Sequence, residues 1–384
     1  MKVLVTDGHL KAALSVARAF GRLGVEVHTT QSRSGSTLCS LSAFTRRAHV
    51  LVAPESGPGF DAQLLDLLQR ERFDYLLATS EPTLQRIALN RDRIGELTRV
   101  DLPPQDSLNL VLSKVGLLEF ARNAHVPIPR TVTYSRSMTA QDILRVLDFP
   151  IVAKTFWGDL YDRVKYINNL QELTLYLAES SPAQMISFQE YVRGIGCGFF
   201  SFFERGKALL CQMHERIWEY PITGGPSVFA RTVDEPVLGD LGRRLLEQLH
   251  WHGLAMVEFK KRGRDDYVLL EINPRPWGSL DLSLASGANF LRLALETDRP
   301  TAARSYVVNG TSFLWLLPDS LLYLLARPTQ AFRFLRLLFS PRVKKNLWLD
   351  DIRPVLRQLR EALYWVRILS RHRRLRYPNG RPFA

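Results

Sequence analysis

Two glutamates and one asparagine near residue 260 have the types and spacing to bind a metal ion. Glu258 lies in the apolar segment AMVEFK, and Glu271 and Asn273 lie in the segment LLEIN. Residues two positions apart on an extended chain point to the same side, so Glu271 and Asn273 share a face. If the two segments pair as a hairpin, two carboxylates and an amide oxygen meet, and Mg²⁺ prefers such oxygen ligands. Solvent-facing strand glutamates are the alternative, which the apolar neighbours of both residues disfavour.

The segments around these glutamates must form the elements that bring them together. Apolar runs predict strands, and helical spacing predicts a helix before the hairpin. The expected strands are 151–153, 199–203, 208–213, 255–259 and 267–272, and the expected helix is 238–249. The last two strands are separated by a turn rich in Lys, Arg, Gly and Asp, which fits a hairpin.

The first hundred residues alternate strand and helix signals. These signals follow one another at 3–6, 12–20, 25–27, 64–68, 75–78 and 84–89. The alternation predicts a doubly wound α/β layer with a parallel sheet. Gly8 stands alone after the first strand, whereas a dinucleotide-binding turn carries three glycines. We therefore do not expect NAD binding.

The segments VEF and EINPR resemble the metal-binding segment of the ATP-grasp superfamily, which includes biotin carboxylase, carbamoyl phosphate synthase and D-alanine–D-alanine ligase. The resemblance extends from about residue 113 to residue 289. It implies an α/β fold with an N-terminal doubly wound pre-ATP-grasp domain, a two-subdomain α+β ATP-grasp domain and a helical basic C-terminal region. The implied domains are 1–112, 113–305 and 306–384, with 113–187 as the small nucleotide-covering subdomain and 188–305 as the metal-binding subdomain.

The resemblance also implies contacts to a metal ion and to ATP. The implied metal ligands are Glu258, Glu271 and Asn273, which would bind Mg²⁺, with Mn²⁺ as an alternative ion. The implied ATP contacts are Lys114, Lys154, Gln189, Glu190, Tyr191 and Val192. The two lysines would offset the charge of the triphosphate. The hinge 189–192 would bind adenine through backbone groups.

Two arginines are the candidate catalytic residues. Arg216 lies in the segment HERIWEYPITGGPS, which resembles the corresponding segment of uncharacterised carboligase-like members of the superfamily. Arg275 follows Asn273 in the segment NPRPW. Because a guanidinium can hold a phosphate or carboxylate through two hydrogen bonds, both side chains are expected to bind a reacting anion. For Arg216, an ordinary surface arginine is the alternative.

Two positions depart from the pattern of the family. Gly196 stands where many members carry a glutamate that holds the ribose hydroxyls, so the ribose contact is unassigned. The loop after Lys154, residues 155–161, contains Gly158 as its single glycine, although the corresponding loop is normally glycine-rich. A loop with fewer glycines offers fewer free backbone amides to a phosphate.

The implied function is an ATP- and magnesium-dependent ligase. ATP would phosphorylate a substrate carboxylate, and an amine or similar nucleophile would displace phosphate from the acyl phosphate. The expected partners are therefore a small-molecule carboxylate and an amine. The alternative is a catalytically weak ATP-binding scaffold on a membrane, which the two departures and the basic tail motivate. A member that stops at phosphoryl transfer is a third, narrower possibility.

Composition limits the classes of protein further. The chain has 384 residues, of which 46% are apolar and 23% charged, so a disordered chain is excluded and more than one domain is expected. Three widely spaced cysteines favour a reducing compartment. The N-terminus turns polar after five residues, which is too short for a signal peptide. These features predict a cytoplasmic protein.

The positive charge is concentrated in residues 327–384. This tail holds 15 Lys and Arg residues and three acidic residues, which accounts for nearly all of the net charge of +13. No nucleic-acid recognition fold accompanies the charge, so we expect no nucleic-acid partner. The Leu-rich segment 313–326 is interrupted by Pro318 and Asp319 and is too short to span a membrane.

The segment 352–371 has the pattern of an amphipathic helix. Its expected apolar stripe is Ile352, Val355, Leu356, Leu359, Leu363 and Val366. An adjacent stripe contains Arg353, Arg357, Arg360, Arg367 and Arg371. Either the helix packs on the body with its arginines in solvent, or the tail lies on the inner face of an anionic membrane, aided by Trp348, Tyr364 and Trp365.

Overall fold

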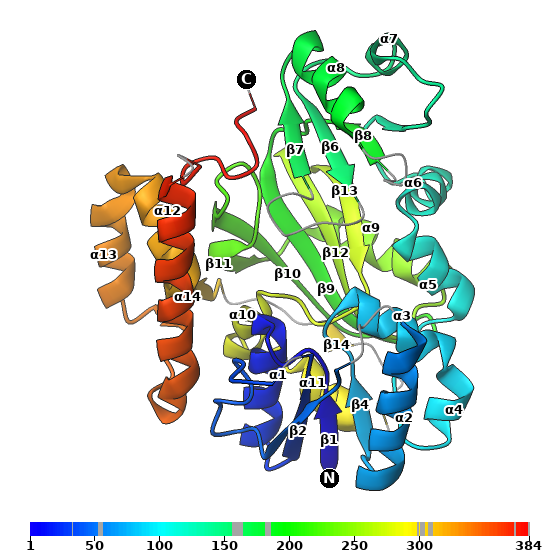
Figure 1. The fold of residues 1–384 in the computed structure, drawn as a ribbon, viewed down its shortest axis with the longest axis vertical. Helices are drawn as coiled ribbons and strands as arrows, with labels where there is room; N and C mark the ends of the chain where they lie inside the picture. Colours follow the sequence, from blue (N-terminus) through cyan, green and yellow to red (C-terminus); the bar gives the residue numbers. More distant parts are fainter. Residues whose placement is uncertain are drawn as a thin grey trace.

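The strands form three sheets in the part of the chain that the structure describes (Figure 1). This computed structural model describes residues 1–382 except 33, 53–56, 156–163, 181–185, 298, 300–303, 306–309 and 372–373. The architecture is the mixed α/β arrangement that the sequence predicts.

The N-terminal sheet is parallel and has helices on both faces. Its strand order is β3 (Arg47–Val50), β2 (Glu26–Gln31), β1 (Lys2–Val5) and β4 (Tyr75–Leu77). The helices around it are α1 (Lys11–Arg22), α2 (Pro58–Glu71), α3 (Glu81–Leu89) and α4 (Arg91–Gly95). Val3 and Val5 pack with α1, whereas Leu4 packs with α2 and α3. The central strand β1 and its neighbour β4 are short apolar runs, as expected where helices cover both faces, which confirms the doubly wound layer.

A small antiparallel sheet follows in the chain. Its order is β5 (Thr131–Thr133), β8 (Ile186–Glu190), β6 (Ile151–Thr155) and β7 (Val164–Ile167). Helices α5 (Gln105–Leu112) and α6 (Lys114–Asn123) lead to it, and α7 (Ala140–Leu144) and α8 (Leu170–Glu179) pack on it. Ile143, Leu173 and Phe188 form the centre of its core. This sheet lies above the large sheet in Figure 1 and carries Lys154 on β6.

The large sheet has eight strands. The order is β13 (Asp266–Asn273), β12 (Gly253–Gly263), β9 (Ile195–Glu204), β10 (Lys207–Glu219), β11 (Ser227–Val233), β15 (Ser312–Leu314) and β16 (Val343–Lys345), and β14 (Arg304–Ser305) pairs with β10. The β9–β10 turn is tight because Arg205 and Gly206 both have positive φ, 46° and 83°. Positive φ at both central residues is what a type I′ hairpin turn requires.

Helices cover both faces of the large sheet. They are α9 (Pro236–Gln248), α10 (Leu280–Ala285) and α11 (Phe290–Leu295). Gly242 lets α9 approach β9 closely, because a Cβ at this position would lie 2.4 Å from the ring of Phe199. Leu238, Leu241 and Leu245 fill the contact, so the apolar face of α9 is buried. Helix α9 therefore packs against β9 and β12 on one face of the sheet.

The C-terminal region contributes strands as well as helices. After β15 follow the short π-helix η1 (Leu316–Ser320), the 3-10 helices η2 (Pro328–Gln330) and η3 (Leu349–Asp351), and the α-helices α12 (Leu321–Ala326), α13 (Ala331–Phe339) and α14 (Ile352–Arg371). The helical prediction is therefore incomplete, because β15 and β16 extend the large sheet. The buried ion pair of Arg18 with Asp351, 2.7 Å long, ties this region to α1.

Candidate functional site

The β12–β13 hairpin forms and brings three predicted site residues together. Glu258 on β12 lies directly opposite Glu271 on β13, with a register shift just after Glu258. The amide Nδ2 of Asn273 donates a hydrogen bond to Oε1 of Glu271 over 2.9 Å. Two carboxylates and one amide thus lie on neighbouring positions of two paired strands.

The two glutamates differ in their charge environment. Burial acts to raise the pKa of Glu258, but the charge and hydrogen bond of Arg216 outweigh burial and hold this pKa below its usual value. Burial and the charge of Glu258 raise the pKa of Glu271, and Lys154 opposes them only in part. Part of the Glu271 residue is exposed to solvent, which weakens these effects without changing their sign. Glu271 therefore carries a negative charge that its described neighbours compensate incompletely.

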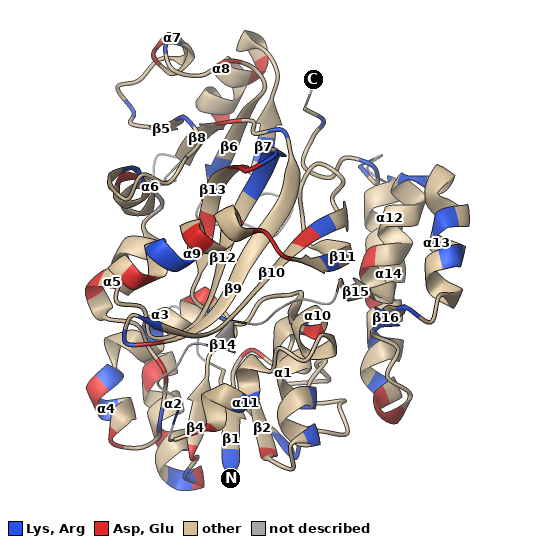
Figure 2. Ribbon diagram, turned by 180° about the vertical axis from the view of Figure 1, so that it is seen from behind, with Lys and Arg blue, Asp and Glu red and all other residues tan. Residues whose placement is uncertain are grey.

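Lys154 reaches the same place from the small sheet. Burial lowers the pKa of Lys154, and the charges that oppose this shift are those of Glu271 and Glu258. Figures 1 and 2 both show β6, which carries Lys154, beside the hairpin that carries the glutamates. The structure thus brings a cation from one sheet to the carboxylates of another.

Arg216 lies on β10 and compensates Glu258. Its Nη1 donates to Oε1 of Glu258 over 2.8 Å, to Oε1 of Glu219 over 3.3 Å and to the backbone oxygen of Gly225 over 3.2 Å. Burial acts to lower the pKa of Arg216, but the two carboxylates raise it above its usual value. The guanidinium is therefore fixed in the site and holds Glu258 in place.

Arg275 connects the site to the N-terminal sheet. Its Nη2 donates to Oδ1 of Asn273 over 3.0 Å and forms an ion pair with Oε1 of Glu81, at the start of α3, over 3.3 Å. The amide of Asn273 is thereby oriented, with its nitrogen on Glu271 and its oxygen on Arg275. A carbonyl oxygen has a second lone pair, so Oδ1 can accept another partner.

The predicted hinge follows the same sheet as Lys154. Gln189 and Glu190 end β8, and Tyr191 and Val192 come directly after it. Gln189 is buried and pairs with Val152 in the ladder, and Glu190 forms an ion pair with Arg130 over 2.8 Å. The backbone after β8 leads into β9, so the hinge joins the small sheet to the large one.

Two of the expected contacts to ATP involve parts of the chain that the structure does not describe fully. Lys114 begins α6, but its side chain is not among the described parts of the chain. Most of the expected phosphate loop, residues 156–163, also lies outside the described residues. Their placement relative to the glutamates therefore stays a prediction.

Glu219 is a site residue that sequence reasoning missed. A Cβ at Gly196 would lie 2.2 Å from Oε1 of Glu219, so this carboxylate fills the space that a side chain at 196 would need. Lys260 lies 3.6 Å from Oε2 of Glu219 and donates to the backbone oxygen of Gly194. A carboxylate is thus present beside Gly196, but it comes from β10.

A bulge explains why the sequence did not reveal Glu219. The register of β10 against β11 shifts between Arg216 and Trp218 and again between Trp218 and Glu219. In a regular strand, residues three apart point to opposite faces, but a bulge resets the alternation. Arg216 and Glu219 can therefore bond to one another, which strict alternation would not predict.

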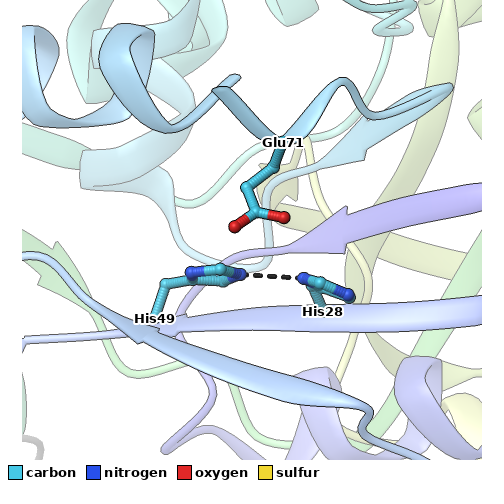
Figure 3. Close-up of side chains that lie close together, drawn as sticks. All are labelled: His28, His49 and Glu71. Carbon is cyan, nitrogen blue, oxygen red and sulfur yellow. Dashed lines mark hydrogen bonds between the residues drawn. The ribbon is translucent and has the colours of Figure 1, made fainter. Parts of the chain in front are cut away.

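A second cluster of ionisable side chains lies in the N-terminal sheet (Figure 3). The ligand-type atoms of His28, His49 and Glu71 lie within 4.8 Å of one another. However, Nδ1 of His28 and Nε2 of His49 are hydrogen-bonded at 2.8 Å, and Glu71 is paired with Lys2 at 2.7 Å and with Arg47 at 3.1 Å. Because the facing ring nitrogens of the two histidines bond to each other and Glu71 is paired with two cations, we interpret this cluster as a structural hydrogen-bond network.

Comparison with known proteins shows that the fold is that of ATP-grasp proteins, as the resemblance in the sequence implies. The family model described as "ATP-grasp in the biosynthetic pathway with Ter operon" matches residues 225–314. The chain is also 23% identical over 273 residues to the carbamoyl phosphate synthase large chain of Rubrobacter xylanophilus, which covers 65% of this chain. The present chain thus spans about a quarter (26%) of the length of that relative.

Solved structures share this fold. N5-carboxyaminoimidazole synthetase from Staphylococcus aureus complexed with ADP superposes with a TM-score of 0.65 and 16% identity, covering 87% of this chain and 86% of that chain. The MgADP-bound biotin carboxylase domain of Hydrogenobacter thermophilus 2-oxoglutarate carboxylase superposes with a TM-score of 0.62 and 14% identity. This match covers 79% of this chain and 71% of that chain. L-amino acid ligase from Bacillus licheniformis superposes with a TM-score of 0.55 and 16% identity, covering 77% of this chain and 73% of that chain.

Proposed function

We propose that this protein is an ATP- and magnesium-dependent ligase that joins a small-molecule carboxylate to an amine. The observation that carries the proposal is the pair Glu258 and Glu271, which lie opposite each other in the hairpin. The charges of both act on Lys154, which lies on β6 of the small sheet. The shared fold with ADP-bound proteins supports it. In this proposal, the nucleotide lies between the subdomains 113–187 and 188–305.

The donor set of the hairpin suits a divalent cation. Glu258, Glu271 and Asn273 would hold Mg²⁺, since carboxylate and amide oxygens are its preferred protein ligands. The raised pKa of Glu271, caused by burial and by Glu258, marks a place where added positive charge is favourable. The ion would neutralise phosphate charge in the reaction. Mn²⁺ accepts the same oxygen donors and is an alternative ion.

The remaining assignments concern ATP. Lys114 and Lys154 would bind the phosphates, and the hinge 189–192 would bind adenine through its backbone. We assign the ribose hydroxyls to Glu219, because its carboxylate occupies the space beside Gly196. This assignment has a test: wild-type protein should bind ATP at least about a hundredfold more tightly than 2′,3′-dideoxy-ATP, because two charge-assisted hydrogen bonds are lost. Glu219→Gln should reduce this discrimination, and unchanged discrimination would refute the assignment.

The reaction would proceed in two steps. An oxygen of the substrate carboxylate attacks the γ-phosphorus, the bond to ADP breaks, and an acyl phosphate forms. The amine then attacks the acyl carbon, loses a proton and expels inorganic phosphate, which leaves an amide. Arg275 would bind the transferred anionic group, and Arg216, which holds Glu258, would compensate charge beside it. No protein nucleophile is required.

ADP release tests the proposed function. Purified protein is incubated with ATP, Mg²⁺ and pools of carboxylates and amines, and products are identified by mass spectrometry. We expect ADP release that needs both a carboxylate and an amine and that disappears in Lys154→Ala. ADP release with a carboxylate alone would indicate a phosphotransferase. ATP binding without turnover across all pools would favour the ATP-binding scaffold.

A further inference from the structure

Helix α14 buries one side and exposes an apolar ridge on another. Pro354, Val355, Gln358, Ala362 and Leu369 are buried against the body. The apolar stripe expected from the sequence is therefore divided: Val355 and Val366 turn inward, and the other four members face solvent. Those four are Ile352, Leu356, Leu359 and Leu363, of which Leu356 and Leu363 are 55% and 56% exposed.

Helix α13 exposes apolar side chains of the same kind. None of its residues is buried, although its sequence AFRFLRLLF is mostly apolar. Phe332 and Phe339 are 74% and 80% exposed, and Leu335 between them is also exposed. Figures 1 and 2 both show α13 and α14 together at one side of the molecule. Exposed apolar side chains that gather on neighbouring helices often mark a surface that binds a partner or a membrane.

Arginines flank the ridge of α14. At 100° per residue, Arg353, Arg360 and Arg367 lie on the side of the ridge away from the buried face, and all three are exposed. Arg333 and Arg336 are exposed on α13, and Figure 2 shows the basic bands along that helix. An exposed apolar ridge bordered by arginines is the pattern of a helix that lies in the interface of an anionic membrane.

We propose that the exposed faces of α13 and α14, here called the C-terminal surface, bind an anionic lipid membrane peripherally. Leu356, Leu363 and the two phenylalanines of α13 would enter the acyl boundary, and the arginines would contact the headgroups. None of the described helices is both long enough and apolar enough to cross a bilayer. The proposal is independent of the proposed ligase activity.

The aromatic contribution is smaller than the sequence predicts. Cζ of Arg22 lies 4.2 Å from the ring centroid of Trp348. Trp365 packs against the core beside α12. Tyr364 is exposed. Of the three aromatic residues expected at a membrane, Tyr364 is thus the one that the structure places at the C-terminal surface.

Charge complementarity selects lipid over other occupants. A second copy in a twofold contact would place this arginine-rich surface against itself. A nucleic acid would satisfy the arginines but would leave the exposed leucines and phenylalanines in water, because its outer surface is charged phosphate. An anionic bilayer offers negative headgroups and an apolar interior in one surface, which matches both features.

Vesicle sedimentation tests the proposal. The full chain is mixed with vesicles of phosphatidylcholine alone or with about one third phosphatidylglycerol. We expect binding to the anionic vesicles at low salt, little binding to phosphatidylcholine alone, and a loss of binding at about 0.5 M salt because charges are screened. Two variants, Leu356→Gln with Leu363→Gln and Arg353→Gln with Arg360→Gln and Arg367→Gln, should each weaken binding at least about tenfold.

Matched controls separate a surface effect from loss of folding. Leu89→Gln with Leu175→Gln and Arg264→Gln change exposed residues outside the C-terminal surface, so they should leave vesicle binding unchanged. Thermal melting should be equal for all variants, since every changed side chain is exposed. Absence of binding to anionic vesicles, or equal binding by the C-terminal and control variants, would overturn the proposal. So would a dimer in light scattering that the leucine variant abolishes.

Discussion

The hairpin site and the histidine cluster contain similar side chains but differ in how their charges are balanced. At the hairpin, Glu271 faces Glu258, and its pKa is raised by burial and by that second charge. In the N-terminal sheet, the hydrogen bond from Lys2 lowers the pKa of Glu71. The hairpin site therefore contains a carboxylate whose charge is compensated only in part, whereas Glu71 in the histidine cluster is paired with two cations.

This difference shows how a functional cluster can be distinguished from a structural one. Residue types alone would favour the histidines and Glu71, because imidazole and carboxylate are common metal ligands. The charges decide otherwise, because Glu71 is paired with two cations, whereas the charge of Glu271 is compensated only in part. Incomplete charge compensation, as at Glu271, is the more informative signal.

Substituting a glutamate in each cluster should give the largest difference between them, measured as ADP release. Glu258→Gln and Glu271→Gln should each reduce ADP release at least about a thousandfold, because the metal ion would lose a charged ligand and the phosphates their neutralisation. Glu71→Gln, in the structural cluster, should keep ADP release within about twofold of wild type. The assay is the coupled measurement of ADP release, and a large loss in Glu71→Gln would remove the distinction.

Acid should weaken the histidine cluster. Burial, with a smaller contribution from the charge of His28, lowers the pKa of His49 to about 4. The unfolded chain takes up this proton near pH 6.5 and the folded chain does not, so stability falls as pH drops from 6.5 towards 4. Between pH 6.5 and 5 the loss should be about 2 kcal/mol for this residue. Hydrogen exchange of the amides of β2 and β3 measures it.

A variant tests the source of that pH dependence. His49→Gln should make the stability of β2 and β3 depend less on pH between 6.5 and 5, because the titrating group is removed. Glu271→Gln, which lies outside this sheet, is the control and should keep the wild-type slope. An unchanged slope in His49→Gln would show that other groups titrate in this range.

Without ligand, Glu271→Gln and Glu71→Gln should change the free energy of unfolding in opposite directions. Glu271→Gln removes a charge repelled by Glu258 and should stabilise the large sheet without ligand. Glu71→Gln leaves Lys2 and Arg47 without their partner and should destabilise the N-terminal sheet by about 1 kcal/mol. Thermal unfolding with hydrogen exchange resolves the two sheets. Destabilisation in both variants would argue against excess negative charge at the hairpin.

Much of the fold could be predicted because its signals are local. The alternation of apolar runs and helical spacing predicts the N-terminal layer, and the polar turn between two apolar runs predicts the β12–β13 hairpin. The short strands β15 and β16 were missed because three residues carry no periodicity. The exposed ridge of α14 was not predictable either, since burial depends on which face meets the body.

The site was predictable where its residues follow regular spacing. Glu271 and Asn273 share a strand face, and Glu258 lies opposite in the hairpin. Glu219 escaped prediction because the bulge in β10 breaks the alternation that sequence reasoning relies on. Its signal was indirect: Gly196 lacks the glutamate seen in the resembling family, and the carboxylate beside it comes from a distant position in the chain.

The magnesium dependence of ATP binding tests the central assignment most directly. Calorimetric titration with ATP, in Mg²⁺ or in EDTA, compares wild type with Glu271→Gln and with Glu71→Gln as the matched control. We expect Mg²⁺ to strengthen ATP binding at least about tenfold in wild type and in Glu71→Gln, because the cation would bridge the hairpin carboxylates and the phosphates. Glu271→Gln should lose this effect. Equal dependence on Mg²⁺ in all three proteins would contradict the assignment.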